Sequence, residues 1–190
     1  MAKQILILFF LVTTYSYSQS VYKDATKIND STDYYLEIGL FNKEEKKSYS
    51  KAILYTEKAI EFAKKNKLSN KLADCYLQLA TIFFELEKND LAIDYYIRAI
   101  SIYSKSEPKS NIALAYYSLG KCYLKKNNIP YAESYFEKAT IVYEKLNFLE
   151  AIEVINLQKA IIKKEKRKYE EAITILKGVI ENISDDALLS

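Results

Sequence analysis

The sequence repeats itself at an interval of forty residues, and this repetition constrains the fold more than any other feature. Residues 73–104 and 113–144 align without a gap. The coinciding positions are Tyr76/Tyr116, Leu79/Leu119, Ala80/Gly120, Phe83/Tyr123, Ala92/Ala132, Tyr96/Phe136 and Ala99/Ala139. Self-similarity at a fixed period of this size indicates a stack of equivalent supersecondary units, each of which buries its apolar face against the next.

The same register extends in both directions beyond these two segments. A small residue recurs every forty residues just after a polar turn, and a second small residue follows seven positions later, with a bulkier one between in most repeats. These positions are Ala52, Ala92, Ala132 and Ala172, then Ala59, Ala99, Ala139 and Val179, with Thr56, Tyr96, Phe136 and Leu176 between them. This spacing lets two antiparallel helices approach closely while one large side chain fills the gap. The sequence predicts an all-α fold of four antiparallel helix pairs, in repeats of about 31–68, 69–109, 110–146 and 147–183.

Capping and turn residues place the helix ends. Pro130 stands in the first turn of a predicted helix, where its missing N–H does no harm. Asn147 followed by Glu150 has the spacing of a capping box and is expected to open the seventh helix. Residues 184–190 are expected to form a tail or the start of a further helix. The other expected helices cover residues 33–41, 49–63, 71–86, 90–104, 110–125 and 169–183.

These motif residues resemble the tetratricopeptide repeat, whose pattern is W-x2-L-G-x2-Y followed by A-x3-F-x2-A. The chain carries it as Tyr116-x2-Leu119-Gly120-x2-Tyr123 with Ala132-x3-Phe136-x2-Ala139, and as Tyr76-x2-Leu79-Ala80-x2-Phe83 with Ala92-x3-Tyr96-x2-Ala99. The resemblance implies a right-handed superhelical solenoid. The period of forty residues exceeds the 34 of the family and is similar to the extended repeats of some bacterial regulators.

The composition argues against catalysis. The chain has no His, which removes Ser-His-Asp and Cys-His arrangements and HExxH zinc motifs. It has only 3 Gly, too few for a phosphate-binding glycine-rich loop. Cys75 and Cys122 are too far apart for a CxxC motif and are expected to be buried packing residues. We expect no enzyme activity, no cofactor and no metal.

The N-terminus differs from the rest of the chain. Lys3 is followed by an unbroken apolar run from Ile5 to Val12, and then by polar residues with small side chains at Ser16 and Ser18. This order is typical of a secretory signal peptide, predicted here as residues 1–18, with residues 19–30 as a tether. The run is too short to span a bilayer. We therefore expect an exported protein, periplasmic or extracellular, with no membrane span in the mature chain. A net charge of +3 together with export makes nucleic acid a poor partner.

In a solenoid of helix pairs, the first helices line the concave side. The face of each first helix that points away from its partner is therefore the candidate groove for a peptide or helix, with Phe84 and Tyr117 as anchors. The candidate residues are Asp74, Leu77, Thr81, Phe84, Leu114, Tyr117, Lys121 and Leu124, with Val154, Leu157, Ile161 and Lys164 in the fourth repeat. The alternative is that these residues pack against neighbouring repeats or a second protomer.

The function expected from the sequence is that of a non-enzymatic scaffold that binds a protein or peptide. Two alternatives stay open. The chain could be the extracytoplasmic sensor segment of a signalling protein, a histidine kinase or a DNA-binding regulator, without its output domain. It could also be a self-assembly module that forms a homo-oligomer.

Overall fold

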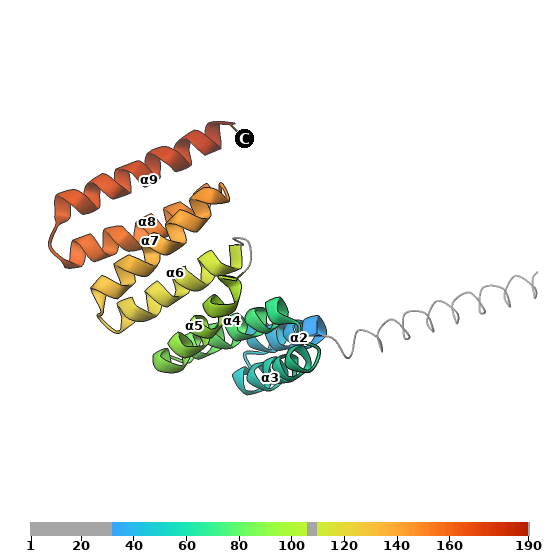
Figure 1. Ribbon diagram of the computed structural model, residues 1–190. Helices are drawn as coiled ribbons and strands as arrows, with labels where there is room; N and C mark the ends of the chain where they lie inside the picture. The colour runs from blue at the N-terminus through green and yellow to red at the C-terminus, as the bar shows by residue number, and fades with distance from the viewer. Residues whose placement is uncertain (1–31, 106–109, 190) are drawn as a thin grey trace, which may run out of the picture. The chain divides into compact units, whose positions relative to one another are not determined.

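The computed structural model describes residues 32–105 and 110–189, with side chains up to residue 183. Every element in this part of the chain is an α-helix, which confirms the predicted all-α class (Figure 1). The predicted signal peptide and tether lie outside the described residues. The helices are α2 (Thr32–Glu44), α3 (Tyr49–Lys65), α4 (Ser69–Glu85), α5 (Asn89–Tyr103), α6 (Ser110–Lys125), α7 (Ile129–Lys145), α8 (Leu149–Glu165) and α9 (Tyr169–Leu189).

The chain divides into two compact units, and the division falls between Lys71 and Leu72 in the first turn of α4. The first unit contains the helix pair α2 and α3, which pack together along their length. Ala52 and Ala59 of α3 are fully buried, as the small–bulky–small spacing predicts. Thr56, between them, is also fully buried and is the smallest of the four gap-filling residues. Its hydroxyl donates a hydrogen bond of 2.8 Å to the Ala52 carbonyl, so this buried polar group has its partner within its own helix.

The second unit contains three consecutive helix pairs, α4–α5, α6–α7 and α8–α9. Helices α6 to α9 follow one another side by side, each packed on the one before it (Figure 1). Phe136 of α7 is completely buried and shares a core cluster with Ile155 and Ile162 of α8, so the gap-filling residue of one pair is covered by the first helix of the next pair. The equivalent residue Tyr96 of α5 is 1% exposed.

Gly120 of α6 marks a close approach of α6 and α7. A Cβ placed there would lie 2.6 Å from Cε1 of Phe136, well inside van der Waals contact. Because Gly120 has no side chain, the Phe136 ring can pack directly against the backbone of α6. Cys75 and Cys122 are both free and buried, which confirms their predicted packing role, and burial raises the pKa of the Cys122 thiol to about 12.

Six helices end in a residue with a left-handed backbone conformation. The sequence did not reveal these helix ends, because none of the six residues is glycine. A residue with positive φ closes six helices, at positions separated by multiples of twenty residues: Lys47, Lys67, Glu87, Asn127, Asn147 and Arg167. After α4, the Glu87 N–H donates to the Phe84 carbonyl at 3.1 Å, and the Lys88 N–H donates to the Phe83 carbonyl at 2.9 Å. This pair of bonds is a Schellman motif, which satisfies the last carbonyls of the helix.

Two predictions about helix ends were wrong. Asn147 does not open α8 with a capping box; with φ of 55° it closes α7, while Phe148 stands at the N-cap of α8 without a side-chain hydrogen bond. Position 184 does not begin a tail or a further helix, because α9 runs without a break from Tyr169 to Leu189. Among the described residues, no helix combines the length and the apolar run needed to cross a bilayer.

Candidate functional site

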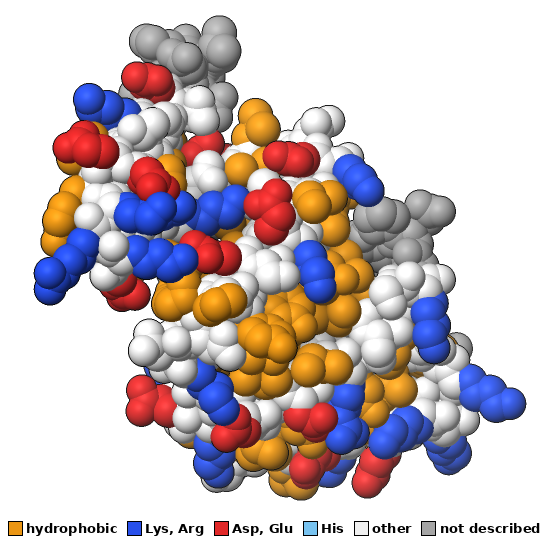
Figure 2. Space-filling model, turned by 60° about the vertical axis from the view of Figure 1, so that its left-hand side comes forward, with side chains coloured by type: hydrophobic (Ala, Val, Ile, Leu, Met, Phe, Trp, Pro, Cys, Tyr) orange, Lys and Arg blue, Asp and Glu red, His pale blue; other side chains and the backbone are white. Residues whose placement is uncertain are grey.

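The residues predicted for the groove all lie on α4, α6 and α8, within the second unit. Their exposure differs strongly. Leu77 is 9% exposed and does not line an open surface, whereas Leu114 is 42% exposed. Phe84, Tyr117, Lys121 and Leu124 are half-buried. Figure 2 shows that hydrophobic side chains do reach the surface of the molecule, in patches between lysines and acidic residues.

Three of the predicted residues form one cluster at the junction of α4 and α6. The Lys121 ammonium lies 5.1 Å from the centre of the Phe84 ring and 4.8 Å from that of the Tyr117 ring. Lys125, which the sequence analysis did not select, also lies over Phe84, at 4.7 Å. Loss of hydration through burial lowers the pKa of Lys121. The two rings therefore hold a partly dehydrated cation in a fixed place, an arrangement whose attraction strengthens as water is excluded.

The second and third repeats differ in the contacts of the residue at the position of Lys121. In the preceding repeat the equivalent residue is Thr81, whose hydroxyl shares a hydrogen bond of 3.3 Å with the Tyr96 hydroxyl. Phe136 replaces Tyr96 in the third repeat and offers no polar atom. Lys121 lies over the Phe84 and Tyr117 rings. Tyr117 also packs on Phe136, with ring centres 5.8 Å apart, so its ring belongs partly to the core.

Asp74 accepts hydrogen bonds from two neighbouring helices. Its carboxylate accepts a hydrogen bond of 2.6 Å from the Tyr103 hydroxyl of α5 and one of 2.8 Å from the Asn111 side chain of α6. Burial, and then the bond to this carboxylate, raise the pKa of Tyr103 well above its usual range. Asp74 thus ties one helix pair to the next.

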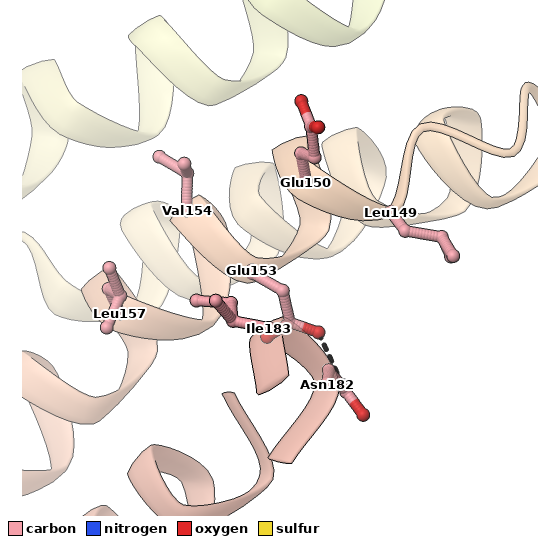
Figure 3. A pocket seen from close by; sticks show the side chains of 7 residues that line it. All are labelled: Leu149, Glu150, Glu153, Val154, Leu157, Asn182 and Ile183. Atoms are coloured by element: carbon pink, nitrogen blue, oxygen red, sulfur yellow. Dashed lines mark hydrogen bonds between the residues drawn. The ribbon is translucent and has the colours of Figure 1, made fainter. Parts of the chain in front are cut away.

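Leu157 and Ile161 of α8 lie at a different place from the aromatic cluster. Both line an apolar hollow of about 560 Å³ between α8 and α9, together with Tyr169, Ile173 and Leu176. A second hollow, of about 390 Å³, adjoins it and shares Leu157 (Figure 3). Within this second hollow, the Asn182 amide donates to the Glu153 carboxylate at 2.6 Å. The sequence analysis missed the α9 residues because it placed the groove on first helices alone.

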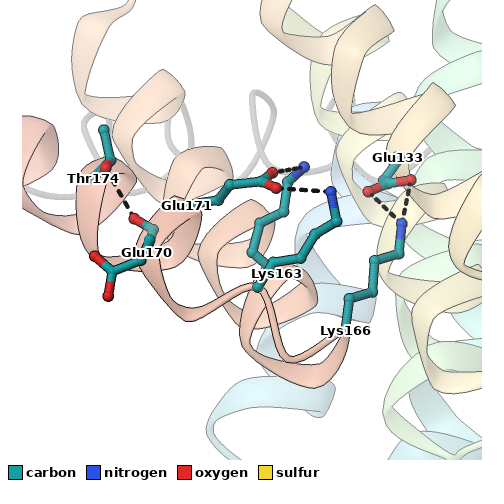
Figure 4. A network of polar contacts seen from close by, with 7 residues as sticks. Glu133, Lys163, Lys166, Glu170, Glu171 and Thr174 are labelled. Atoms are coloured by element: carbon teal, nitrogen blue, oxygen red, sulfur yellow. Dashed lines mark hydrogen bonds and ion pairs between the residues drawn. The ribbon is translucent and has the colours of Figure 1, made fainter.

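A network of ion pairs joins α7, α8 and α9 at the turn between the last two helices (Figure 4). Lys166 donates to the Glu133 carboxylate at 2.9 Å, and Lys163 and Lys168 each donate to Glu171 at 2.7 Å. The two lysines hold the pKa of Glu171 down to about 2, chiefly through these hydrogen bonds. Both of these acidic groups have cationic partners, which suits a structural role better than acid–base catalysis.

In the part of the chain that the structure describes, no three side chains of His, Cys, Asp or Glu come together as metal ligands would. The second unit offers a half-buried cationic–aromatic cluster and an apolar hollow, and both are surfaces that suit the binding of a ligand.

Residues 71–145 match the family model described as tetratricopeptide repeat. The chain is 30% identical over 96 residues to response regulator aspartate phosphatase E of Bacillus subtilis strain 168, across 49% of this chain and 26% of that protein. The fold is similar to BtubC (BKLC) from P. vanneervenii, with a TM-score of 0.74 and 20% identity over 82% of this chain and 64% of that one. It is also similar to the Rap conjugation gene regulator of the plasmid pLS20 in complex with the Phr* peptide, with a TM-score of 0.66 and 20% identity over 79% and 42% of the two chains.

The chain spans less than two thirds of the length of each of these proteins. At 20% identity the structural likeness establishes the fold alone. One relative carries the name of a phosphatase but is matched over only a quarter of its length, so the absence of enzyme activity in this chain stays a prediction. The forty-residue register, the stacked helix pairs and the matched motif agree, and residues 71–145 of the chain are tetratricopeptide repeats.

Proposed function

We propose that this chain is a non-enzymatic scaffold that binds a peptide, or a peptide-like segment of a protein, across α4 and α6. Interaction with proteins is the general role of stacked helix pairs, whose repeated first helices form an extended binding surface. The Rap regulator in complex with the Phr* peptide supplies an example of this fold holding a peptide. Because the chain spans 42% of that regulator, the role is proposed here on the chain's own residues.

The observation that carries the proposal is the cluster of Phe84, Tyr117 and Lys121. Half-buried aromatic rings are the side chains that most often anchor a binding segment. The ammonium held over both rings has given up part of its hydration. A carboxylate brought to it meets a cation that has already lost water, which makes the ion pair less costly to form. Leu114 is exposed two helical turns before Lys121, on the same face of α6, and offers an apolar contact further along this surface. The ligand class is therefore a peptide with an acidic group next to apolar side chains.

A selection from a displayed library of random peptides on the full chain tests this proposal. The expected result is enrichment of peptides that combine Asp, Glu or a free carboxyl terminus with apolar residues. Lys121→Gln should weaken the binding of a selected peptide about thirtyfold or more, since truncating a hydrogen-bonded, partly buried charge costs roughly 2 kcal/mol or more. Phe84→Ala should have a similar effect and leave the helical circular dichroism intact.

Lys138→Gln is the matched control. Lys138 also lies over two tyrosine rings, at 5.9 Å from Tyr116 and 4.8 Å from Tyr135, but it belongs to α7 and is exposed. The same change there should leave peptide affinity as it is. Selected peptides without acidic groups, or equal affinities for Lys121→Gln and the wild type, would rule out this site.

A sensing role is the second candidate. The observation in its favour is that the chain's fold is similar to that of a protein named as a gene regulator, in complex with a peptide. In this sensing role, the cluster of Phe84, Tyr117 and Lys121 binds a peptide outside the cytoplasm after export of the chain. Export predicts removal of residues 1–18, and sequencing the N-terminus of the protein recovered from outside the cytoplasm of an expressing bacterium tests it. An intact Met1 on that protein, or its retention in the cytoplasm, would exclude the extracytoplasmic version.

A further inference from the structure

Helix α9 has one broad apolar face, and only one edge of it is buried against α8. Ala172 and Val179 are buried against α8. Next to this buried stripe, on the flank of α9 that borders the hollow, lie five side chains that are between 40% and 64% exposed: Tyr169, Ile173, Leu176, Ile180 and Ile183. Their spacing is four, three, four and three residues, which is the a/d spacing by which one α-helix packs along another. We call this row of five side chains the outer seam.

The preceding repeats show what kind of element covers such a seam. Positions 176, 180 and 183 correspond to Phe136, Thr140 and Tyr143 of α7, which are 0%, 7% and 8% exposed. Helix α8 covers that surface, through Ile155 and Ile162 among others. The outer seam therefore continues an interface that the second unit already makes twice, between α5 and α6 and between α7 and α8, and its natural occupant is another helix.

The charges beside the outer seam indicate which helix. Glu170 and Lys177 are exposed and flank the seam on the same side, seven residues apart. Figure 4 shows Glu170 pointing away from the Lys163–Glu171 ion pair. If a second copy of α9 packs antiparallel, with Ile173 of one copy beside Leu176 of the other, Glu170 of each copy faces Lys177 of the other. In a parallel arrangement, Glu170 and Lys177 of one copy would instead face the opposite flank of the other copy. That flank carries Ala172 and Val179, so no ion pair forms.

The size of the surface is compatible with self-association. The outer seam and the neighbouring Leu157 and Ile161 expose on the order of 600 Å² of apolar side chain, against roughly 800 Å² per partner in a stable interface. The hollow between α8 and α9 gives the helix ridge of a second molecule a groove to enter. A charged residue already bridges the corresponding interface within the chain, where Lys159 of α8 pairs with Glu137 of α7 at 3.3 Å.

We propose that two copies of this chain associate through α9, packed antiparallel along the outer seam, with reciprocal Glu170–Lys177 ion pairs. This surface is separate from the Phe84–Lys121–Tyr117 cluster, so a dimer leaves the proposed peptide site open in each copy.

Light scattering on the full chain across a range of concentrations tests the proposal. The wild type should form a concentration-dependent dimer. Leu176→Glu should raise the dimer dissociation constant at least about a hundredfold, because it buries a charge at the centre of the seam. Ile97→Glu makes the same kind of change at an exposed position of α5 and should leave the mass unchanged.

Charge reversal separates the proposed register from a general loss of folding. Glu170→Lys and Lys177→Glu should each raise the dissociation constant about tenfold, since each turns two attractive pairs per dimer into two repulsive ones. The double variant should return close to the wild-type value. Glu144→Lys on α7 controls for the change in net charge. A wild type that stays monomeric throughout, a dimer insensitive to Leu176→Glu, or a double variant no tighter than the single ones would overturn the proposal.

Discussion

The pairs α6–α7 and α8–α9 follow one register and differ in what covers their second helix. Phe136 of α7 is fully buried, whereas Leu176, forty residues later, is 40% exposed. The contacts inside each pair are the same in kind: Ala132 and Ala139 are fully buried, and so nearly are Ala172 and Val179. The small residues thus hold a pair together, while the bulky residue between them depends on the next helix. Stability in this fold is therefore shared between a repeat and its neighbour.

The largest expected difference between the two pairs comes from truncating the gap-filling residue. Phe136→Ala should lower the free energy of unfolding by about 3–5 kcal/mol, because it removes a fully buried ring from a closed core. Leu176→Ala should cost less than about 1 kcal/mol under conditions where the chain is monomeric, because that side chain is already in contact with water. Urea unfolding followed by circular dichroism measures both. Similar losses in the monomer would mean that Leu176 is covered in solution by part of its own chain.

Gly120 and Gly178 should respond to the same substitution with opposite signs. In α6, Gly120→Ala sets a methyl group against the Phe136 ring, at 2.6 Å before any adjustment, and should destabilise by about 1–3 kcal/mol. In α9, a methyl group added to Gly178 would meet no other atom within 4 Å, so Gly178→Ala should stabilise by about 0.5–1 kcal/mol through helix propensity alone.

Each glycine variant is the control for the other, since the chemical change is identical and only the surroundings differ. Thermal unfolding at one protein concentration suffices to compare them. A gain in stability from Gly120→Ala would show that the Phe136 ring can move aside, and that the close approach of α6 and α7 is not required.

Much of this architecture could be predicted from the sequence because the register determines it. The alanines at 92, 99, 132 and 139 mark where helices touch, and all four are fully buried. The turns could not be predicted in the same way. Asn147 followed by Glu150 has the spacing of a helix start, yet Asn147 closes the preceding helix in a left-handed conformation. Local patterns at helix ends are ambiguous because Asn suits both roles.

The candidate site was predictable only in part. The positions of Phe84, Tyr117 and Lys121 on first helices follow from the register, but the contact between Phe84 of α4 and Lys121 of α6 does not. Asp74 looks like a groove residue in the sequence and is bound by Tyr103 and Asn111 in the structure. Such pairings join different helices, and the spacing within one helix does not reveal them.

The smallest expected effect concerns the polar end of the α8–α9 pair, and it depends on pH. Lys163 and Lys168 hold the pKa of Glu171 down to about 2, whereas a free glutamate has a pKa of about 4.3. Because the folded value is lower, the ion pairs stabilise the fold above about pH 4.5, and this contribution disappears as the pH falls towards 2. The groups are exposed, so salt should weaken the effect.

Urea unfolding at pH 6 and pH 3 tests this expectation. The Glu171→Gln variant should be less stable than the wild type at pH 6, and the difference in unfolding free energy should be smaller at pH 3. If the difference in unfolding free energy between variant and wild type is the same at pH 6 and pH 3, Glu171 acts through packing and not through its charge.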